Sequence, residues 1–469
     1  MIMLERQLAE ILGPKGWSPA ADSAPWSRDW LNRYGEPPLG VARPISTAEV
    51  AAVMAATHRA GVAVVPQGGN TGLCGAAVLG RAGGVILNLS RMAGMEPPDP
   101  AGDSVTVQAG LVLARLHEAL DGTDLMFPMH LGAEGSAQIG GLIGTNAGGS
   151  QAFRYGMMQD LVLGLEVVLP DGTVWNGLRG VQKDNAGYQL RKLFCGAEGT
   201  LGVVTHAVLR LHPAPRQRAT ALLALPSFDA AVQYGRLVRA EAGEFLQAME
   251  FFSETGLALA LNHVPALTWP LQSRGIAYLL LELGAGSPLV PLADIMTALL
   301  EQGMAQGMIA DGALAASGAQ RAAFWRLREE QPEGQRLEGP QLKHDISVPP
   351  ARIADFIAQG NDLCNGIIPG VRINPFGHLA DGNIHYNLTP PVGQRDFAGH
   401  DAALGSALAE LATGMGGSFA AEHGLGRSKI ALADALRPKV ERGLNRRIKT
   451  AFDPADLLNP GVILADTDK

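Results

Sequence analysis

Hydrophobic and polar positions after residue 45 predict a helix followed by a strand. Ser46 and Glu49 have the spacing of a capping box, apolar residues follow at helical intervals, and Gly61 offers the left-handed conformation that ends a helix. Residues 62–65 are apolar and rich in β-branched side chains, which is typical of a strand. Because residues 66–75 are rich in glycine, the pattern predicts a helix, a strand and a glycine loop in succession.

The remaining pattern divides the chain near residue 213. Strand-like runs occupy 85–89, 105–109, 165–169 and 203–211, with a hairpin turn at Asp171-Gly172. Later in the chain, helical patterns at 228–242, 292–302, 319–330, 401–414 and 433–452 accompany strand patterns at 277–283 and 343–347. No period of 20–50 residues repeats, which excludes a solenoid. We predict an α+β protein with domains at 1–213 and 214–425 and a C-terminal helical segment at 426–469.

Length, charge and cysteine usage narrow the class of protein. At about 150 residues per domain, 469 residues suggest roughly two to four domains. The net charge of −8 and the lack of a run of basic residues argue against nucleic acid and favour a small-molecule substrate. The three cysteines are widely spaced, which favours a reducing compartment. No apolar stretch approaches the ~20 residues of a membrane helix, and residues 1–13 lack a secretory pattern. We therefore expect a cytoplasmic protein.

Glycine is the compositional outlier, at 59 of 469 residues against an average near ~7%. Many glycines cluster at 68–75, 140–149 and 196–202. No cluster has the full Rossmann context and no Gly-Lys dipeptide occurs, so NAD on a Rossmann fold and ATP on a P-loop are disfavoured. Two separated loops whose successive amides can surround a diphosphate suit an extended dinucleotide. Tight turns without a ligand remain the alternative for each loop taken alone.

Five motifs, taken in order, connect these loops to a known family. Residues 66–72 are PQGGNTG, 135–149 are GSAQIGGLIGTNAGG, 196–202 are GAEGTLG, 377–385 are GHLADGNIH and 422–427 are EHGLGR. Together they resemble FAD-linked oxidoreductases of the vanillyl-alcohol oxidase and p-cresol methylhydroxylase fold, in the D-2-hydroxyglutarate and D-lactate dehydrogenase branch. The resemblance covers about residues 29–464. It implies a two-part FAD-binding domain followed by an α+β substrate (cap) domain with an antiparallel sheet.

The resemblance also implies which residues hold FAD. They are Pro66, Gly68, Gly69, Asn70, Thr71, Gly72, Ser136, Gly140, Gly141, Thr145, Asn146, Gly149, Gly202, Val204 and Asn459. The first two loops would hold the diphosphate and ribityl chain, Gly202 and Val204 would lie near the adenine, and Asn459 would close the flavin site. Residues 66–75 contain no histidine of the kind that links flavin covalently in some relatives, so we expect non-covalent FAD. Cys74 is expected to pack beside the loop.

Two histidines around Asp381-Gly382 have the spacing of a metal site. If the hairpin turn closes at these two residues, His378 and His385 pair directly, with Cβ atoms ~5 Å apart. Two imidazoles at that distance can share one ion, and Glu422 is the natural carboxylate to complete the set. Zn²⁺ is the first expectation, with Mn²⁺, Fe²⁺ and Co²⁺ open, and the resembling family has a metal site at these positions. Hairpin histidines bonded to the backbone are the alternative.

Four further residues are candidates for proton transfer and substrate binding. His423 is the candidate general base, because an imidazole with an ordinary pKa near ~6.5 accepts a proton at neutral pH. Asn387 follows His385 by two positions and would bind the substrate, unless it is a plain strand amide. Arg328 and Lys343 match positions that bind substrate carboxylates in the resembling family, while each alone also fits an exposed surface charge.

These assignments predict an FAD-dependent, metal-assisted dehydrogenase that converts a D-2-hydroxy acid to the 2-oxo acid. Electrons would leave to an acceptor other than NAD, such as an electron-transfer flavoprotein or a quinone. D-2-Hydroxyglutarate is the first expected substrate and D-lactate the second, because Pro332 replaces a hydroxyl residue often found one turn after the arginine and is expected to end that helix. The alternatives are a transferase of the alkyl-dihydroxyacetone-phosphate synthase type, an oxidase that uses oxygen, and a metal hydrolase with a structural dinucleotide. A homodimer would be unsurprising.

Overall fold

The computed structural model describes residues 2–466, which form two compact units. Unit 1 contains residues 2–149, 155–213 and 422–466, and unit 2 contains residues 150–154 and 214–421. The chain therefore leaves unit 1 after Pro213 and returns to it at Glu422. Within residues 2–466, no helix is both long and apolar enough to cross a membrane.

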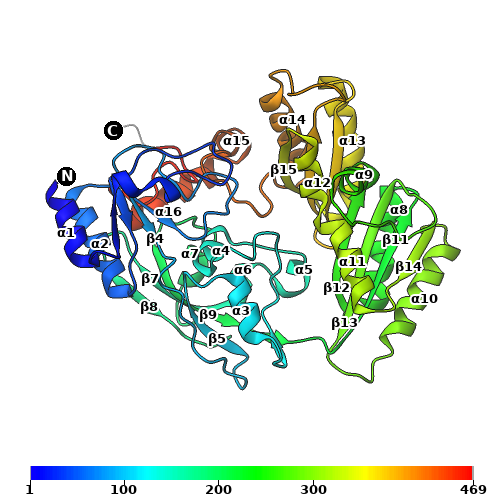
Figure 1. Ribbon diagram of the computed structural model, residues 1–469, viewed down its shortest axis with the longest axis horizontal. Coiled ribbons are helices and arrows are strands. Elements are labelled where there is room, and N and C mark those ends of the chain that lie inside the picture. The colour runs from blue at the N-terminus through cyan, green and yellow to red at the C-terminus, as the bar shows by residue number, and fades with distance from the viewer. Residues whose placement is uncertain (1, 467–469) are drawn as a thin grey trace. The chain divides into compact units, whose positions relative to one another are not determined.

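Unit 1 contains a mostly parallel sheet and an antiparallel sheet (Figure 1). The first has the order β1-β2-β4-β3, formed by β1 Trp17–Pro19, β2 Gly40–Ala42, β4 Val85–Asn88 and β3 Val64–Gln67; only β1 runs antiparallel to its neighbour. The second has the order β5-β9-β7-β8, formed by β5 Ser104–Gln108, β9 Val203–Arg210, β7 Val162–Val168 and β8 Val174–Gly177. A short pair joins β6 Leu125–Met126 to β10 His212–Pro213.

Most helices of unit 1 pack apolar side chains into one core, which includes Leu8, Val53, Leu116 and Ile143. The helices of unit 1 are α1 Ile2–Leu12, α2 Thr47–Ala60, α3 Leu113–Leu120, α4 Ile139–Thr145, α6 Met158–Leu161, α7 Leu190–Phe194, α15 Ile430–Leu436 and α16 Lys439–Phe452, with the 3-10 turns Ala20–Asp22 and Ala24–Trp26. Helix α5, Ala152–Tyr155, includes residues of both units. The helix predicted over 433–452 is thus two helices, which separate before Pro438 because proline restricts the residue that precedes it.

Local sequence signals around α2 are confirmed. The Ser46 side chain accepts a hydrogen bond from the Glu49 N–H at 3.2 Å, and the Glu49 carboxylate accepts from the Ile45 N–H at 2.8 Å. Gly61 ends the helix with a φ of 64°. These contacts satisfy amides at the start of the helix, and the helix leads directly into β3 and the first glycine loop.

In the described part of the chain, unit 2 contains one antiparallel sheet of seven strands, in the order β14-β11-β13-β12-β16-β17-β15. The strands are β11 Gln217–Leu225, β12 Leu246–Ser253, β13 Ala277–Ala285, β14 Asp311–Leu314, β15 Leu342–Ser347, β16 Arg372–His378 and β17 Asn383–Thr389. The helices are α8 Phe228–Ala242, α9 Glu254–His263, α10 Leu292–Ala305, α11 Gly318–Glu329, α12 Gln331–Glu338, α13 Ile353–Ile367 and α14 Asp401–Gly414, with a 3-10 turn at Pro350–Arg352.

Helices cover both faces of this sheet (Figure 1). Helices α8, α10, α13 and α14 pack on a large apolar core, whereas α9 and α11 pack on a smaller one that includes Phe252, Phe324 and Phe376. Helix α11 ends at Glu329, and Pro332 lies in the first turn of α12, where its missing N–H costs no hydrogen bond. The smaller core leaves room on its side of the sheet for polar residues.

Candidate functional site

The sheet of unit 2 carries a set of polar side chains on one face. Strand residues two positions apart share a face. On the neighbouring strands β12, β16, β17 and β15, the shared face carries Glu250, Asn374, His378, Asn383, His385, Asn387, Asp345 and Lys343. The opposite face carries apolar side chains such as Phe251, Ile384 and Tyr386. Buried polar groups need partners, so this face is the candidate site in unit 2.

The hairpin between β16 and β17 is longer than the sequence predicted. Its turn contains residues 379–382 rather than Asp381-Gly382 alone, so the predicted direct pairing of His378 with His385 is wrong. The first turn residue, Leu379, is buried and donates its N–H to β12, which keeps it out of the ladder between β16 and β17. The observed pairing of β16 with β17 is shifted by two residues from the predicted one. Because side chains alternate between the two faces of a strand, His378 and His385 still lie on the same face of the sheet. The two imidazoles are therefore diagonal neighbours, with ring centroids 5.7 Å apart.

A buried carboxylate that sequence reasoning missed fixes the orientation of His378. Glu250 lies opposite His378 in the sheet, and its Oε1 is 2.6 Å from His378 Nδ1. Because a carboxylate only accepts hydrogen bonds, Nδ1 carries the proton and Nε2 has the lone pair that binds a metal. Burial would raise the pKa of Glu250, but its electrostatic interactions and hydrogen bonds with His378 and Arg328 hold it below its ordinary value.

Arg328 is buried and is not an exposed surface charge. Its Nη2 lies 2.8 Å from Glu250 Oε2, and its guanidinium lies over the ring of Phe376, 4.8 Å from the centroid. Within residues 2–466, Arg328 Nε is buried without a hydrogen-bond partner. A buried donor without an acceptor is costly, so this nitrogen offers a place for an anionic group.

The other predicted substrate residues lie on the same face. Asn387 is buried between Asn374 and Lys343 in the sheet register, and its Nδ2 donates to Gln335 Oε1 of α12 at 3.0 Å. Lys343 is exposed. His385 pairs with Asp345, and its Nδ1 lies 3.7 Å from Asp345 Oδ1. The structure thus brings His378, His385, Arg328, Asn387 and Lys343 onto one sheet face.

The donor set of this face fits a divalent transition metal. Two imidazoles with ring centroids 5.7 Å apart can share one ion, and Nδ1 of each lies beside a buried carboxylate. Ligating histidines commonly donate their other ring N–H to a carboxylate, which orients the ring and raises its basicity. The structure therefore brings together, within unit 2, two imidazoles that could ligate a metal and the carboxylates beside them.

The glycine loop after β3 in unit 1 has the properties of a diphosphate cradle. Within the described chain, the backbone amides of residues 68–72 donate no hydrogen bond to protein acceptors. The buried Gln138 Oε1, also unpartnered there, would lie 3.5 Å from a Cβ at Gly68. Unpaired amides in succession bind anions, so the first loop and the start of the second fit the diphosphate of a dinucleotide.

The glycines of the FAD motifs divide into two kinds. A Cβ at Gly69 would lie 2.0 Å from the Ser136 carbonyl oxygen, and Cβ atoms at Gly140, Gly149 and Gly202 would collide with other protein atoms. Close packing between segments explains these four positions. A Cβ at Gly72 or Gly141 would meet no protein atom within 4 Å, and one at Gly68 would make only ordinary contacts from 3.5 Å, so close packing within the protein does not explain these three glycines.

The remaining residues implied for FAD also lie in unit 1. Thr145 and Asn146 end α4, and the Asn146 side chain accepts from the Gln159 N–H at 2.8 Å. Val204 lies in β9 and is buried. Asn459 is buried and donates its side-chain amide to the carbonyls of Ala76 and Glu198, at 2.9 and 2.7 Å. Asn459 therefore ties the C-terminal segment to the first glycine loop.

Comparison with known proteins identifies the family. Residues 214–463 match the family model "FAD linked oxidases, C-terminal domain", and residues 38–177 match an "FAD binding domain". The chain belongs to the FAD-linked oxidases. This FAD-linked oxidase is 37% identical over 450 residues to D-2-hydroxyglutarate dehydrogenase of Xanthomonas citri pv. viticola, covering 96% of this chain and 94% of the relative. It is also 37% identical to the mitochondrial D-2-hydroxyglutarate dehydrogenase of Bos taurus, covering 92% and 78%.

Solved structures confirm the expected fold. A p-cresol methylhydroxylase with bound substrate superposes on this FAD-linked oxidase with a TM-score of 0.78 at 16% identity, covering 100% of this chain and 98% of that one. An alkyldihydroxyacetonephosphate synthase gives 0.73 at 16% identity, covering 98% and 84%. Identities this low support the fold alone. Together with the relatives, they establish an FAD-dependent dehydrogenase with the two-domain fold that the motifs predicted.

In this FAD-linked oxidase, the loop that carries Glu422 and His423 is held by a second buried carboxylate. Glu198 accepts from the N–H groups of Leu425 and Gly426, both at 2.8 Å. Burial is the main reason that the pKa of Glu198 is raised to about 7. Cys74 is buried beneath the same loop, with Sγ 3.6 Å from the Gly424 carbonyl oxygen. These contacts fix the loop within unit 1.

Sequence reasoning missed Glu250, Gln335 and Glu198. A signal for Glu250 existed, since it is the one charged residue within the run Leu246–Ser253 and a lone charge in a buried strand needs a partner. Glu198 lies inside a motif that was attributed to FAD as a whole. No comparable signal marks Gln335, which lies among other polar residues of α12.

Proposed function

We propose that this FAD-linked oxidase converts D-2-hydroxyglutarate to 2-oxoglutarate, with D-lactate as the alternative substrate. The relatives named D-2-hydroxyglutarate dehydrogenase match nearly the whole chain. The observation that carries the proposal is the buried chain from His378 through Glu250 to Arg328, with His385 beside it. This group combines two imidazoles that can bind a metal with the guanidinium of Arg328, whose Nε is unpaired within residues 2–466. A 2-hydroxy acid offers a hydroxyl group for the metal and a carboxylate for the guanidinium.

The proposed ligands of a divalent metal, with Zn²⁺ as first choice, are His378, His385 and Glu422. Glu422 follows Ala421, whose N–H donates to the carbonyl of Asp345, the strand partner of His385. Two histidines and one carboxylate leave coordination positions for a substrate. When bound, the metal would make the substrate hydroxyl more acidic and FAD would take up the hydride from C2.

His423 is the proposed general base. FAD, when bound, would take up the C2 hydride with its two electrons, His423 would accept the hydroxyl proton, and the C2–O bond would become a carbonyl, so that atoms and charge balance. Arg328 and Lys343 would bind the substrate carboxylates, and Asn387 would orient the substrate by a hydrogen bond. The proposed domains are 1–213 for FAD, 214–425 for substrate and 426–469 for the C-terminal helical segment.

The electrons are proposed to leave to an electron-transfer flavoprotein or a quinone. Three free cysteines among the described residues agree with a reducing cytoplasm, the proposed location.

Anaerobic reduction of the bound flavin tests the function. We expect D-2-hydroxyglutarate to bleach the flavin absorbance at low concentration, D-lactate to do so less effectively, and L-2-hydroxyglutarate not to do so. Bleaching by none of these acids would contradict the proposal and leave the transferase as the alternative. Verified metal removal should slow flavin reduction by the preferred acid, and unchanged rates would exclude the metal from the reaction.

A further inference from the structure

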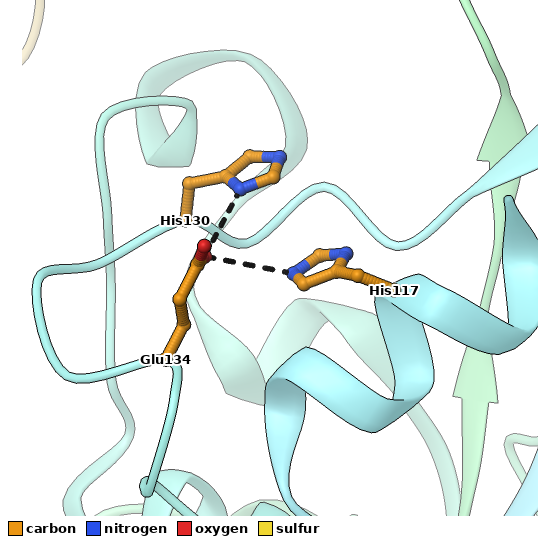
Figure 2. A group of neighbouring side chains, drawn as sticks. All are labelled: His117, His130 and Glu134. Carbon is orange, nitrogen blue, oxygen red and sulfur yellow. Dashed lines mark hydrogen bonds and ion pairs between the residues drawn. The ribbon is translucent and has the colours of Figure 1, made fainter.

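A second group of metal-type ligands lies in unit 1, away from the polar face of unit 2. Figure 2 shows His117, from the last turn of α3, together with His130 and Glu134, from the segment after β6. His130 Nδ1 lies 3.2 Å and His117 Nε2 lies 3.9 Å from the same oxygen, Glu134 Oε2. One ligand atom from each residue lies within 4.8 Å of the other two. Three side chains thus converge on one point.

The spacing is close to that of a metal's coordination shell. Zinc binds histidine nitrogen at ~2.0–2.1 Å and carboxylate oxygen at ~2.0–2.2 Å with tetrahedral angles, so its ligand atoms lie about 3.3–3.5 Å apart. The two distances to Glu134, 3.2 and 3.9 Å, need changes of only about half an ångström or less to reach these values, and the two histidine nitrogens lie within 4.8 Å of each other. Such changes are within the rotation of half-exposed side chains.

The backbone holds the three residues before any ion binds. The Glu134 carbonyl accepts from the Ala114 N–H at 3.0 Å, which joins its segment to the start of α3. A Cβ at Gly149 would lie 2.3 Å from the His130 carbonyl oxygen, so the second glycine loop packs tightly behind His130. The rings of His117 and His130 are stacked, with centroids 4.6 Å apart and planes 8° from parallel. The backbone positions are thus set before an ion binds, and one of the two rings has to turn for both ring nitrogens to face the same ion.

A stabilising ion pair does not account for the contact between His130 and Glu134. An ordinary ion pair between His130 and Glu134 would be worth little, because their side chains are 52% and 42% exposed. It would also leave the stacked second imidazole unexplained.

We propose that His117, His130 and Glu134 bind a divalent transition-metal ion such as Zn²⁺ or Co²⁺ in unit 1. Binding replaces two contacts, because their nitrogens become the ligands: that of 2.9 Å between His117 Nε2 and the Met129 carbonyl oxygen, and that of 3.2 Å between His130 Nδ1 and Glu134 Oε2. That carbonyl or a water molecule would fill the fourth position. The ion would join α3 to the segment that continues into Ser136 and Gln138, which lie against Gly69 and Gly68. It would therefore stabilise one wall of the diphosphate cradle.

Metal counting on the FAD-loaded, full-length enzyme tests the proposal. The His385→Ala variant, which lacks a proposed ligand of the active-site metal, is first treated with a chelator under conditions that retain FAD. Equilibrium dialysis against Zn²⁺ should then load one equivalent of metal per chain, bound at the site in unit 1. Adding Glu134→Gln or His130→Asn to that variant should remove this equivalent, and a Co²⁺ spectrum should disappear in parallel. An unchanged metal content in these combined variants, or no metal in His385→Ala alone, would overturn the proposal.

Two further measurements separate this site from the proposed active site. The single variant Glu134→Gln should reduce its flavin with substrate at a rate close to that of wild type, because Glu134 lies outside the proposed catalytic groups. Its melting temperature should no longer rise with Zn²⁺ as far as that of wild type does, since a ligand stabilises only the state it binds. The matched control Glu118→Gln changes an exposed carboxylate of α3, the helix that carries His117, and should keep the full metal content. Loss of metal in Glu118→Gln as well would refute the assignment to Glu134.

Discussion

Glu250 shows how one buried carboxylate can serve two residues of a site. Its Oε1 fixes the tautomer of His378 while its Oε2 pairs with Arg328. We expect Glu250→Gln to weaken metal binding by about 10–100-fold, the usual effect of losing a carboxylate behind a ligating histidine. The unpaired Arg328 should also destabilise the protein by about 3–5 kcal/mol. Dialysis against Zn²⁺ and denaturant unfolding measure the two effects.

Glu282 provides a matched control on the same sheet face. It is also buried and pairs with an arginine of α11, Arg321, but it has no histidine neighbour. Glu282→Gln should therefore destabilise the protein while leaving metal affinity unchanged. Equal losses of metal affinity in both variants would mean that Glu250 acts through stability alone.

Glu198 makes stability depend on pH through the loop that carries His423. Its pKa is raised to about 7 in the folded protein, so the folded state holds this proton more tightly than the unfolded chain does. The resulting stabilisation is fully present below the unfolded pKa and is lost as pH rises through about 7. Unfolding of wild type and Glu198→Gln across pH 4 to 8 should show a steeper decline for wild type. Parallel curves would contradict this assignment.

At the level of elements, the sequence correctly predicted those features that depend on interactions between residues close together in the chain. The cap of α2 depends on residues within one turn, and its boundaries were confirmed. The register of the β16–β17 hairpin depends on Leu379, which bonds to β12, a strand more than 100 residues earlier in the chain. The burial of Arg328 likewise depends on Glu250. Helical patterns around Arg328 show no such partner, so sequence alone could not distinguish a buried ion pair from a surface charge.

Gly377 provides the test at this level, because the hairpin requires a glycine there. Its φ is 153°, and a Cβ would lie 2.2 Å from the Asn383 carbonyl oxygen. Gly377→Ala should therefore cost about 3 kcal/mol or more and disturb the adjacent His378. Gly366, exposed near the end of α13 with no atom within 4 Å of a Cβ, is the control. Its alanine variant should gain up to about 1 kcal/mol in a denaturant titration. Equal stability of both variants would contradict the requirement at Gly377.

In the whole molecule, the residues proposed to bind FAD diphosphate and those on the polar sheet face belong to different units of the chain. The diphosphate cradle is built from residues of unit 1, whereas the polar sheet face is built from residues of unit 2. Each unit has its own core, and each group has a buried carboxylate near it, Glu198 in unit 1 and Glu250 in unit 2. Cofactor binding and metal binding should therefore be separable by mutation, although turnover needs both.

Gly72→Asp should remove FAD without unfolding the protein. No protein atom lies within 4 Å of a Cβ at Gly72, so the new side chain fits, but its charge faces the proposed diphosphate. Two like charges ~4 Å apart repel by about 4 kcal/mol at an effective dielectric constant near ~20, so FAD affinity should fall by more than ~100-fold. The Gly72→Asp variant should still bind metal through His378 and His385. The His385→Ala variant should show the opposite behaviour: it should keep one FAD per chain, but substrate should no longer reduce that FAD. Gly443→Asp, on an exposed position of α16, is the control and should keep both ligands. Full FAD retention in Gly72→Asp would exclude residue 72 from the cradle.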